Sequence, residues 1–280
     1  MSGAKRIIAD RRSLIATLIL LALLVAALPA LAITHGEPDG NDHPFVGSIV
    51  IRIPEEGLFQ WCSGTLIASD VFLTAAHCIA PLDGLFDVFP DAEVLVTFDP
   101  TISPGGNFFT GQWVISPNFN GFSGKGGLSD PGDVAVILLD SAPGIAPASL
   151  PPAGMLDQLK ADHILKDTRF TAVGYGTVRD TNRTGFQAIM ANLDRNRSEQ
   201  GFLSLTQAWL TLPMTPSNGN GGTCYGDSGG PHFIHLNGVE TNIVASITVT
   251  GDAPCKATDK TYRMDTEATR AFLGNDVTLP

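Results

Sequence analysis

Three residues of types that can act together in nucleophilic catalysis stand far apart in this chain of 280 residues. His77 ends one apolar run, Asp133 begins another, and Ser228 lies in the glycine-rich hexapeptide GDSGGP. A serine becomes a nucleophile when a base takes its proton and an acid orients that base. The residue types, in the order His, Asp, Ser along the chain, therefore predict acyl transfer through a serine.

Each of the three residues also has a simpler interpretation on its own. A single histidine at the end of a strand is more often structural. Asp133 could simply cap the preceding turn, although a buried carboxylate needs a partner for its charge. The glycines around Ser228 could form only a tight turn, but they also let backbone N–H groups approach a bound oxygen. The combination, not any single residue, indicates a catalytic site.

Taken together, the three segments resemble the motifs of the chymotrypsin-like (trypsin-like) serine proteases. Residues 73–78 (LTAAHC) are similar to the histidine motif of that family, residues 133–139 (DVAVILL) to its aspartate motif, and residues 224–231 (CYGDSGGP) to its serine motif. The resemblance extends over about residues 33–273, which is most of the chain.

The resemblance implies a serine endopeptidase that hydrolyses peptide bonds through an acyl-enzyme, without a metal or cofactor. His77 would take the proton from Ser228, and Asp133 would orient His77. The N–H groups of Gly226 and Ser228 would form the oxyanion hole. Ser246 would help to hold Asp133, and residues 246–248 would pair with the substrate backbone.

The resemblance also locates a substrate pocket, which we expect to be formed by Gly222, Thr223, Tyr225, Ile247 and Thr248. Family members that cut after lysine or arginine have an aspartate six residues before the catalytic serine. Glycine occupies that position in this chain, so specificity for basic side chains is not supported.

Activation in this family depends on a new amino terminus, and the chain has a candidate for it. Mature family members begin with an Ile-Val-Gly-Gly-like sequence whose amine pairs with the aspartate before the serine, here Asp227. Residues 33–36 (ITHG) resemble that terminus loosely. We expect signal cleavage before Ile33 to create the activating amine; the alternative is that Asp227 pairs with an internal group.

The elements expected to position these residues are strands. The 30 glycines and 19 prolines, and short β-branched runs at residues 45–53, 94–98, 134–139 and 243–249, predict an all-β chain. Asn237-Gly238 predicts a tight hairpin turn. The resemblance implies two six-stranded antiparallel β-barrels with the site between them: residues 33–145, with His77 and Asp133, and residues 146–280, with Ser228. Helical spacing appears only in a short C-terminal helix at residues 266–273, with Asp265 as its cap.

The start of the chain predicts export. Basic residues precede an apolar run at residues 14–28, and Ala30 and Ala32 stand where a signal peptidase reads small side chains. We interpret residues 1–32 as a signal peptide, because about 15 apolar residues are few for the roughly 20 of a membrane-spanning anchor. The protein is then secreted or periplasmic. Arg11-Arg12 leaves twin-arginine export open beside ordinary secretion.

Four cysteines in an exported chain indicate two disulfides, for which spacing alone allows three connectivities. A zinc site is the competing interpretation, but no Cys-x-x-Cys or His-x-x-x-His cluster accompanies the cysteines. The resemblance implies the pairs Cys62–Cys78, behind the histidine, and Cys224–Cys255, beside the specificity pocket.

The charge balance limits the partners. A net charge of −11, with no visible basic patch, disfavours binding to nucleic acid. We expect protein or peptide substrates, protein protease inhibitors as further partners, no membrane contact after signal removal, and a monomer. Two other functions compete: a catalytically silent binding protein on the same fold, and an esterase-type hydrolase. The Gly-x-Ser-x-Gly motif typical of the esterases is not matched around Ser228.

Overall fold

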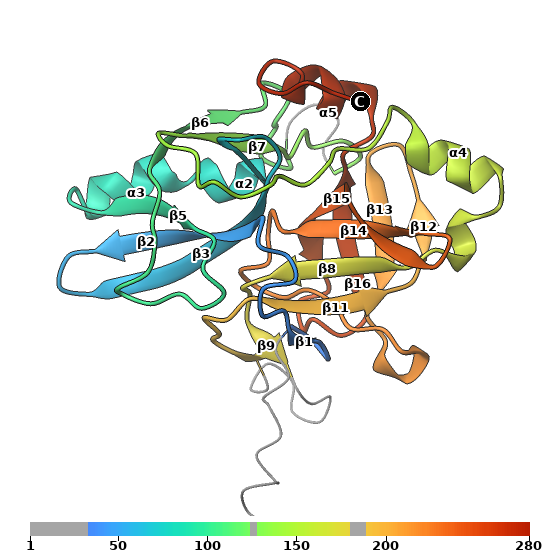
Figure 1. Cartoon of the computed structure of the whole chain (residues 1–280), viewed down its shortest axis with the longest axis horizontal. Helices are drawn as coiled ribbons and strands as arrows, with labels where there is room; N and C mark the ends of the chain where they lie inside the picture. Colours follow the sequence, from blue (N-terminus) through green and yellow to red (C-terminus); the bar gives the residue numbers. More distant parts are fainter. Residues whose placement is uncertain (1–32, 124–127, 180–188) are drawn as a thin grey trace, which may run out of the picture. The chain divides into compact units, whose positions relative to one another are not determined.

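The computed structural model describes residues 33–123, 128–179 and 189–280, and most of their regular structure is antiparallel β (Figure 1). The expected signal peptide, residues 1–32, lies outside the described residues. None of the helices within the described ranges is long and apolar enough to cross a membrane.

The first sheet has six strands and carries the histidine and aspartate motifs. Its strand order is β5 (Glu93–Thr97), β2 (Val46–Ile53), β3 (Gly57–Leu66), β4 (Val71–Thr74), β7 (Ala135–Leu139) and β6 (Gly111–Ile115). Two reciprocal backbone hydrogen bonds of 2.8 Å join Val96 of β5 to Phe109, just before β6. These bonds bring the two edges of the sheet toward each other, so the sheet curls.

The second sheet has eight strands and includes the hairpin that follows the serine motif. Its order is β1 (Glu37–Pro38), β11 (Asn196–Gln200), β8 (Phe170–Gly174), β14 (Pro231–Leu236), β15 (Val239–Gly251), β16 (Thr258–Arg263), β13 (Trp209–Pro213) and β12 (Ser204–Leu205). β9 (Val178–Arg179) and β10 (Ile189–Met190) form a separate pair. The predicted antiparallel all-β class is confirmed; the eight strands exceed the expected six because the two-residue strands β1 and β12 extend the edges.

The hairpin of β14 and β15 has the predicted turn and an unpredicted irregularity. Asn237 and Gly238 both have positive φ values, 53° and 76°, as a tight two-residue turn requires. The pairing register shifts on both sides of Phe233, which marks β-bulges. Each shift changes which residues of β15 lie opposite the serine motif, and sequence counting cannot detect it.

The prediction of a single helix is wrong. The structure has α2 (Ala76–Ile79), α3 (Leu82–Val88), α4 (Met155–Ala161), α5 (Glu267–Leu273) and the 3-10 turns η1 (Leu165–Asp167) and η3 (Pro216–Asn218). The missed helices have seven residues or fewer, too few for a periodic apolar pattern.

The C-terminal helix α5 is confirmed, but its cap is Thr266 and not Asp265. The Thr266 hydroxyl accepts a hydrogen bond from the N–H of Thr269. Asp265 instead accepts from the N–H of Leu156 and pairs with buried Arg263. A buried arginine requires a carboxylate more strongly than an exposed helix start does, which explains the difference.

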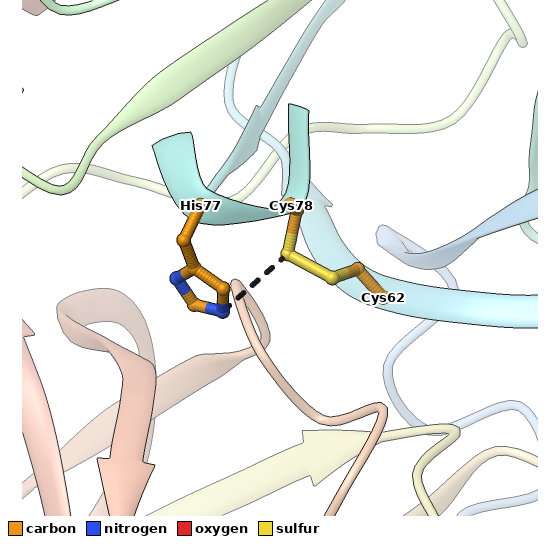
Figure 2. Close-up of side chains that lie close together, drawn as sticks. All are labelled: Cys62, His77 and Cys78. Atoms are coloured by element: carbon orange, nitrogen blue, oxygen red, sulfur yellow. Dashed lines mark hydrogen bonds between the residues drawn. A yellow bond between two sulfur atoms is a disulfide. The ribbon is translucent and has the colours of Figure 1, made fainter. Parts of the chain in front are cut away.

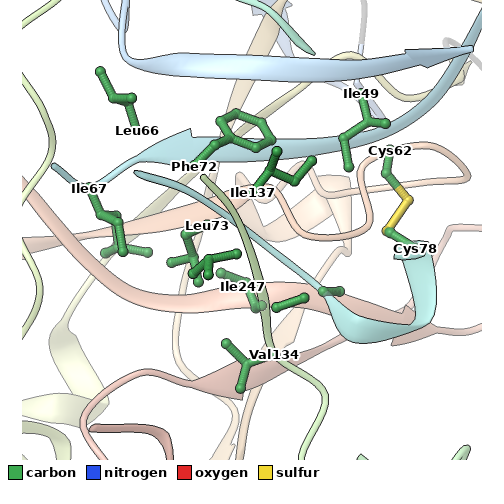
Figure 3. Close-up of a cluster of buried hydrophobic side chains, with 14 of the residues drawn as sticks. Ile49, Cys62, Leu66, Ile67, Phe72, Leu73, Cys78, Val134, Ile137 and Ile247 are labelled. Atoms are coloured by element: carbon green, nitrogen blue, oxygen red, sulfur yellow. A yellow bond between two sulfur atoms is a disulfide. The ribbon is translucent and has the colours of Figure 1, made fainter. Parts of the chain in front are cut away.

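The largest hydrophobic core contains residues of both sheets. Figure 3 shows Ile247 of β15 beside Leu73 of β4 and Val134 near the start of β7, with the Cys62–Cys78 disulfide at one side of the cluster. Ile247 is completely buried there. The histidine and aspartate motifs therefore pack against β15, the second strand of the hairpin that follows the serine motif.

Candidate active site

Neighbouring strands place His77 and Asp133 side by side. β4 and β7 pair with Thr74 opposite Ala135, so the residues just after β4 and just before β7 meet at one end of the sheet. Asp133 accepts hydrogen bonds from the backbone N–H of His77 at 2.8 Å and faces His77 Nδ1 with its other oxygen at 2.7 Å. The Asp133 side chain is fully buried, whereas that of His77 is 24% exposed. This geometry fixes the imidazole orientation and leaves Nε2 for a second partner.

The loop that carries Ser228 is held from both sheets. The Ser228 carbonyl accepts a 2.9 Å hydrogen bond from the N–H of Ser63 on β3. The N–H of Gly229 donates to the Thr248 carbonyl of β15 at 2.8 Å. Gly229 has φ +79°, and a Cβ there would lie 2.5 Å from the carbonyl oxygen of Ser63. Only glycine fits this position, which explains the first glycine after the serine.

His77 and Ser228 approach the same disulfide. The Sγ atom of Cys78 lies 3.9 Å from His77 Nε2 and 3.7 Å from the Ser228 carbonyl oxygen. No hydrogen bond joins the Ser228 hydroxyl to His77 within the residues that the structure describes. Catalytic hydrogen bonds are often long or poorly aligned before a substrate binds.

The two disulfides are the pairs that the resemblance implies, Cys62–Cys78 and Cys224–Cys255. Figure 2 shows that His77 lies against the first of them, so that three ligand-type atoms are within 4.8 Å of one another. Both sulfurs are consumed by the disulfide, and zinc binds thiolates. The cluster therefore offers a metal only the imidazole.

Two backbone N–H groups beside Ser228 are available to a bound oxygen. The carbonyl of Gly226 accepts hydrogen bonds from Gln60 Nε2 at 2.8 Å and Ser63 Oγ at 3.0 Å, which anchors the loop to β3. Over the described part of the chain, the N–H groups of Gly226 and Ser228 donate to no other group. Gly226 has φ +95°, a conformation that glycine adopts readily.

Ser246 is not hydrogen-bonded to Asp133. Its buried hydroxyl accepts a 2.7 Å hydrogen bond from Thr261 of β16, and the described hydrogen bonds to Asp133 come from His77 alone. Residues 246–248 also have backbone partners on both sides. β16 pairs with all three, β14 pairs with Ser246 and Ile247, and Thr248 exchanges hydrogen bonds with Gly229 and Gly230. They cannot pair with a substrate backbone as expected. β14 begins at Pro231, opposite Ile247, so its pairing leaves that edge of β15 open from Val249 onward.

A cavity of about 250 Å³ opens beside Ser228. Of the expected pocket residues, Thr223, Tyr225 and Thr248 line it, whereas Gly222 and Ile247 do not. Ile247 is buried in the core that contains residues of both sheets. The stretch from Thr248 to Cys255, which the resemblance implies as the far wall of the pocket, contributes further lining residues: Val249, Thr250, Gly251, Asp252 and Ala253. The bulges in the hairpin shift the position of Ile247 along β15, which single-sequence alignment does not detect.

Asp227 is a buried carboxylate next to this cavity. It accepts hydrogen bonds from Gly176 N–H at 2.7 Å and Cys224 N–H at 2.9 Å. Burial raises the pKa of Asp227 to about 7, against the lowering effect of the two N–H groups, and the nearby Asp259 charge raises it further. No cationic side chain contacts Asp227 in the described ranges. Such a carboxylate lacks a compensating charge.

Ile33 lies close to the same loop. It is completely buried, and Thr34 pairs with Gly222 through reciprocal hydrogen bonds of 3.0 and 2.9 Å. Gly222 is two residues before Cys224, whose N–H holds Asp227. The structure thus brings the first residues after the expected signal cleavage to the loop that contains Ser228.

Comparison with known proteins gives concordant results. A sequence model of the Trypsin family matches residues 33–271. The chain is 29% identical to a trypsin from Saccharopolyspora erythraea over 210 residues, covering 71% of this chain and 81% of that protein. It is 30% identical over 241 residues to the venom plasminogen activator Haly-PA of Gloydius brevicauda, covering 82% of this chain and 83% of that protein. A solved structure of HL collagenase is similar in fold, with a TM-score of 0.59 at 17% identity, covering 89% of this chain and 97% of the other.

Proposed function

The chain belongs to the trypsin family, and from this premise we propose that it is an exported serine endopeptidase with a His77–Asp133–Ser228 triad. The observation that carries the proposal is the pair formed by buried Asp133 and His77 Nδ1 at 2.7 Å, with Ser228 on a loop held by both sheets. The family membership supports hydrolysis of peptide bonds, and the two disulfides are compatible with an oxidising compartment.

The proposed reaction uses these residues in the usual order of a serine triad. His77 Nε2 takes the proton from Ser228 as Oγ attacks the scissile carbonyl, and then gives it to the leaving amine. Asp133 holds the imidazole and stabilises the imidazolium that forms. Water then attacks the acyl-enzyme, again with His77 as the base, which releases the acid product and restores Ser228.

The N–H groups of Gly226 and Ser228 would stabilise the oxyanion in both steps. Their lack of other acceptors in the described structure supports this role. The two hydrogen bonds that Gln60 and Ser63 donate to the Gly226 carbonyl would keep the peptide in one orientation. Removing one donor of this kind typically costs about 3–4 kcal/mol of transition-state stabilisation.

Activation would follow release of Ile33 as a new amino terminus. The amine would supply the cation that buried Asp227 lacks, and the pairing of Thr34 with Gly222 supports a position for it close to that carboxylate. In the competing scheme Asp227 keeps only its backbone donors and needs no amine. Mass spectrometry of the exported protein separates the two schemes, because activation by the amine requires a mature chain that begins at Ile33.

The substrate side chain before the scissile bond would be uncharged. The cavity beside Ser228 is lined by neutral groups and by one carboxylate, that of Asp252. Both oxygens of Asp252 already accept hydrogen bonds from the N–H groups of residues 256–258. A buried lysine or arginine side chain would therefore have to share this carboxylate with three backbone N–H donors. The open edge of β15 from Val249 to Gly251 would pair with the substrate backbone.

The remaining parts of the proposal concern the whole chain. Residues 1–32 would act as the export signal, residues 33–145 as the unit that carries His77 and Asp133, and residues 146–280 as the unit that carries Ser228. The mature protein would be a monomer that acts on proteins or peptides and is open to protein protease inhibitors. A secreted or periplasmic location follows from the same proposal.

A second function, a catalytically silent binding protein, is favoured by one observation. The described hydrogen bonds include none between the Ser228 hydroxyl and His77. Hydrolysis of an unlabelled protein such as casein separates the two functions. Under the main proposal the purified mature protein cleaves it, Ser228→Ala abolishes cleavage, and Ser204→Ala, at an exposed serine of β12, does not. No cleavage by any form supports the alternative, whereas equal cleavage by the Ser228→Ala variant contradicts the proposed role of Ser228.

A further inference from the structure

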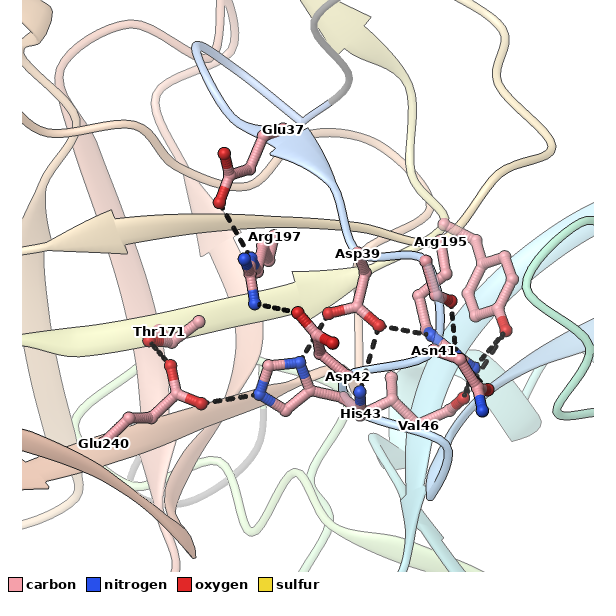
Figure 4. Close-up of polar contacts among 12 residues, drawn as sticks. Glu37, Asp39, Asn41, Asp42, His43, Val46, Thr171, Arg195, Arg197 and Glu240 are labelled. Atoms are coloured by element: carbon pink, nitrogen blue, oxygen red, sulfur yellow. Dashed lines mark hydrogen bonds and ion pairs between the residues drawn. The ribbon is translucent and has the colours of Figure 1, made fainter.

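A network of charges around the buried side chains of His43, Asp39 and Arg195 lies outside the proposed catalytic centre. It joins residues 33–46, the N-terminal segment, to the second sheet (Figure 4). His43 is at its middle: Nδ1 lies 2.5 Å from Asp39 Oδ1, and Nε2 lies 2.7 Å from Glu240 Oε1 of β15. The His43 side chain is only 5% exposed, and its ring stacks on Phe233 with 5.2 Å between centroids.

The geometry requires His43 to be a cation. A neutral imidazole has one N–H, yet both ring nitrogens of His43 face carboxylate oxygens within hydrogen-bond distance. Burial by itself lowers the pKa of His43, but the hydrogen bonds and charges of Asp39 and Glu240 outweigh it and raise the pKa to about 9. His43 therefore bridges two carboxylates, one from the N-terminal segment and one from β15.

Arg195 is a second anchor of the same segment. Its side chain is fully buried, and Nε donates to Asp39 Oδ2 at 2.8 Å. The other nitrogens donate to the carbonyls of Gly40 at 2.9 Å and Val46 at 3.0 Å. A buried arginine with these partners fixes the path of the backbone, because moving the segment would leave the charge unpaired.

The network continues to the loop of the proposed catalytic serine. Arg195 also donates to the hydroxyl of Tyr175 at 3.2 Å, and the next residue, Gly176, holds Asp227 through its N–H. At its other end the N-terminal segment pairs with the loop directly, through Thr34 and Gly222. Between these two ends β1 pairs with β11, so the segment contacts the second sheet along its length, and the charged network lies at the end farther from Ile33.

We infer that His43, bridging Asp39 and Glu240, is a positioning residue that keeps the N-terminal segment docked, so that Ile33 stays buried beside the Ser228 loop. This inference rests on the proposed function, because docking of Ile33 matters for catalysis only if its amine pairs with Asp227. The clamp, as we name His43, Asp39, Glu240 and Arg195 together, shifts the equilibrium between docked and released segments.

The groups that face His43 define its pH behaviour. Asp39 lies on its own segment and Glu240 on β15, while the rings of Phe45 and Phe233 that pack against it carry no charge. Behind these two carboxylates lie further charged groups: Arg195 at Asp39, and His235 at Glu240, 3.6 Å away. The pKa values of both carboxylates are lowered, and that of His43 is raised. The clamp therefore opens as the pH rises through about 9, when His43 loses its proton.

The test compares His43→Gln and Glu240→Gln with wild type in the exported, disulfide-intact protein. His163→Gln, at an exposed histidine, is the matched control. Two quantities are measured at pH 7.5: kcat and KM for a small chromogenic ester, and the reactivity of the Ile33 α-amine toward an acylating reagent, read by peptide mass spectrometry. If the docked population falls to about one tenth, kcat/KM falls about tenfold, and the α-amine is labelled faster than in wild type because most molecules have a released segment.

The expected result is this paired change in both clamp variants and neither change in His163→Gln. A clamp variant with wild-type kcat/KM and a protected amine overturns the inference. So does a lower kcat/KM with the amine still protected, which is what general damage to the fold produces, or a mature chain that does not begin at Ile33. If wild type shows no Ser228-dependent turnover, the proposed function fails. Amine labelling then decides the inference alone: it stands if both clamp variants expose the Ile33 amine, and it fails if the amine stays protected.

Discussion

The bridging position of His43 makes a quantitative prediction about stability. Its pKa rises from an ordinary 6.5 to about 9 on folding. Because each pKa unit corresponds to about 1.4 kcal/mol, the folded state gains roughly 3 kcal/mol from binding this proton. The gain is fully present below pH 6.5, where both states are protonated. It is lost between pH 6.5 and 9, where only the folded state holds the proton.

The assay is urea unfolding at pH 6 and pH 9.5, carried out with the disulfides intact. A Ser228→Ala background prevents self-digestion. Between pH 6 and pH 9.5, the protein with His43 should lose about 3 kcal/mol more unfolding free energy than the His43→Gln variant loses. Subtracting the variant removes the contribution of every group that titrates in both proteins. A difference below about 1 kcal/mol would refute the assignment of a buried imidazolium between two carboxylates.

Three further predictions concern the proposed site. Asp133→Asn should lower kcat about 10⁴-fold with little change in stability, because the amide favours the wrong imidazole tautomer; steady-state kinetics and thermal unfolding check both parts. Gly229→Ala should lose about 1–3 kcal/mol of unfolding free energy, since the added Cβ would meet the Ser63 carbonyl at 2.5 Å, and chemical denaturation measures it. Peptides with an uncharged residue before the scissile bond should be cut about 10²-fold faster than matched lysine peptides, because the Asp252 carboxylate in the pocket already accepts three backbone hydrogen bonds; equal rates would contradict the neutral pocket.

The sequence predicts which residues lie close together at the proposed site better than it predicts the elements that support them, as the contact between His77 and Asp133 shows. The three motifs that carry the resemblance have short-range settings: His77 lies in the one-turn helix α2 after β4, Asp133 lies just before β7, and Ser228 lies in a glycine turn. The disulfide pairs followed from the same resemblance. These features depend on a few neighbouring residues, which a single sequence displays.

Features that depend on distant contacts were not predictable. The bulges around Phe233 shift β15 against β14, so the open edge begins at Val249 and Ser246 bonds to Thr261. Ile247 is buried because residues of the other sheet pack against it. The clamp joins His43 to Glu240, 197 positions later, and no local pattern marks that pairing.

The central claim is that Ser228 is an activated nucleophile. The most direct measurement is labelling of the mature protein with a fluorophosphonate probe, followed by peptide mapping of the modified residue. The account predicts one adduct, on Ser228, that disappears in Ser228→Ala and is strongly slowed in His77→Ala, with the exposed Ser204 unmodified. Absence of the adduct from a correctly processed, disulfide-intact chain, or labelling that does not depend on His77, would contradict it.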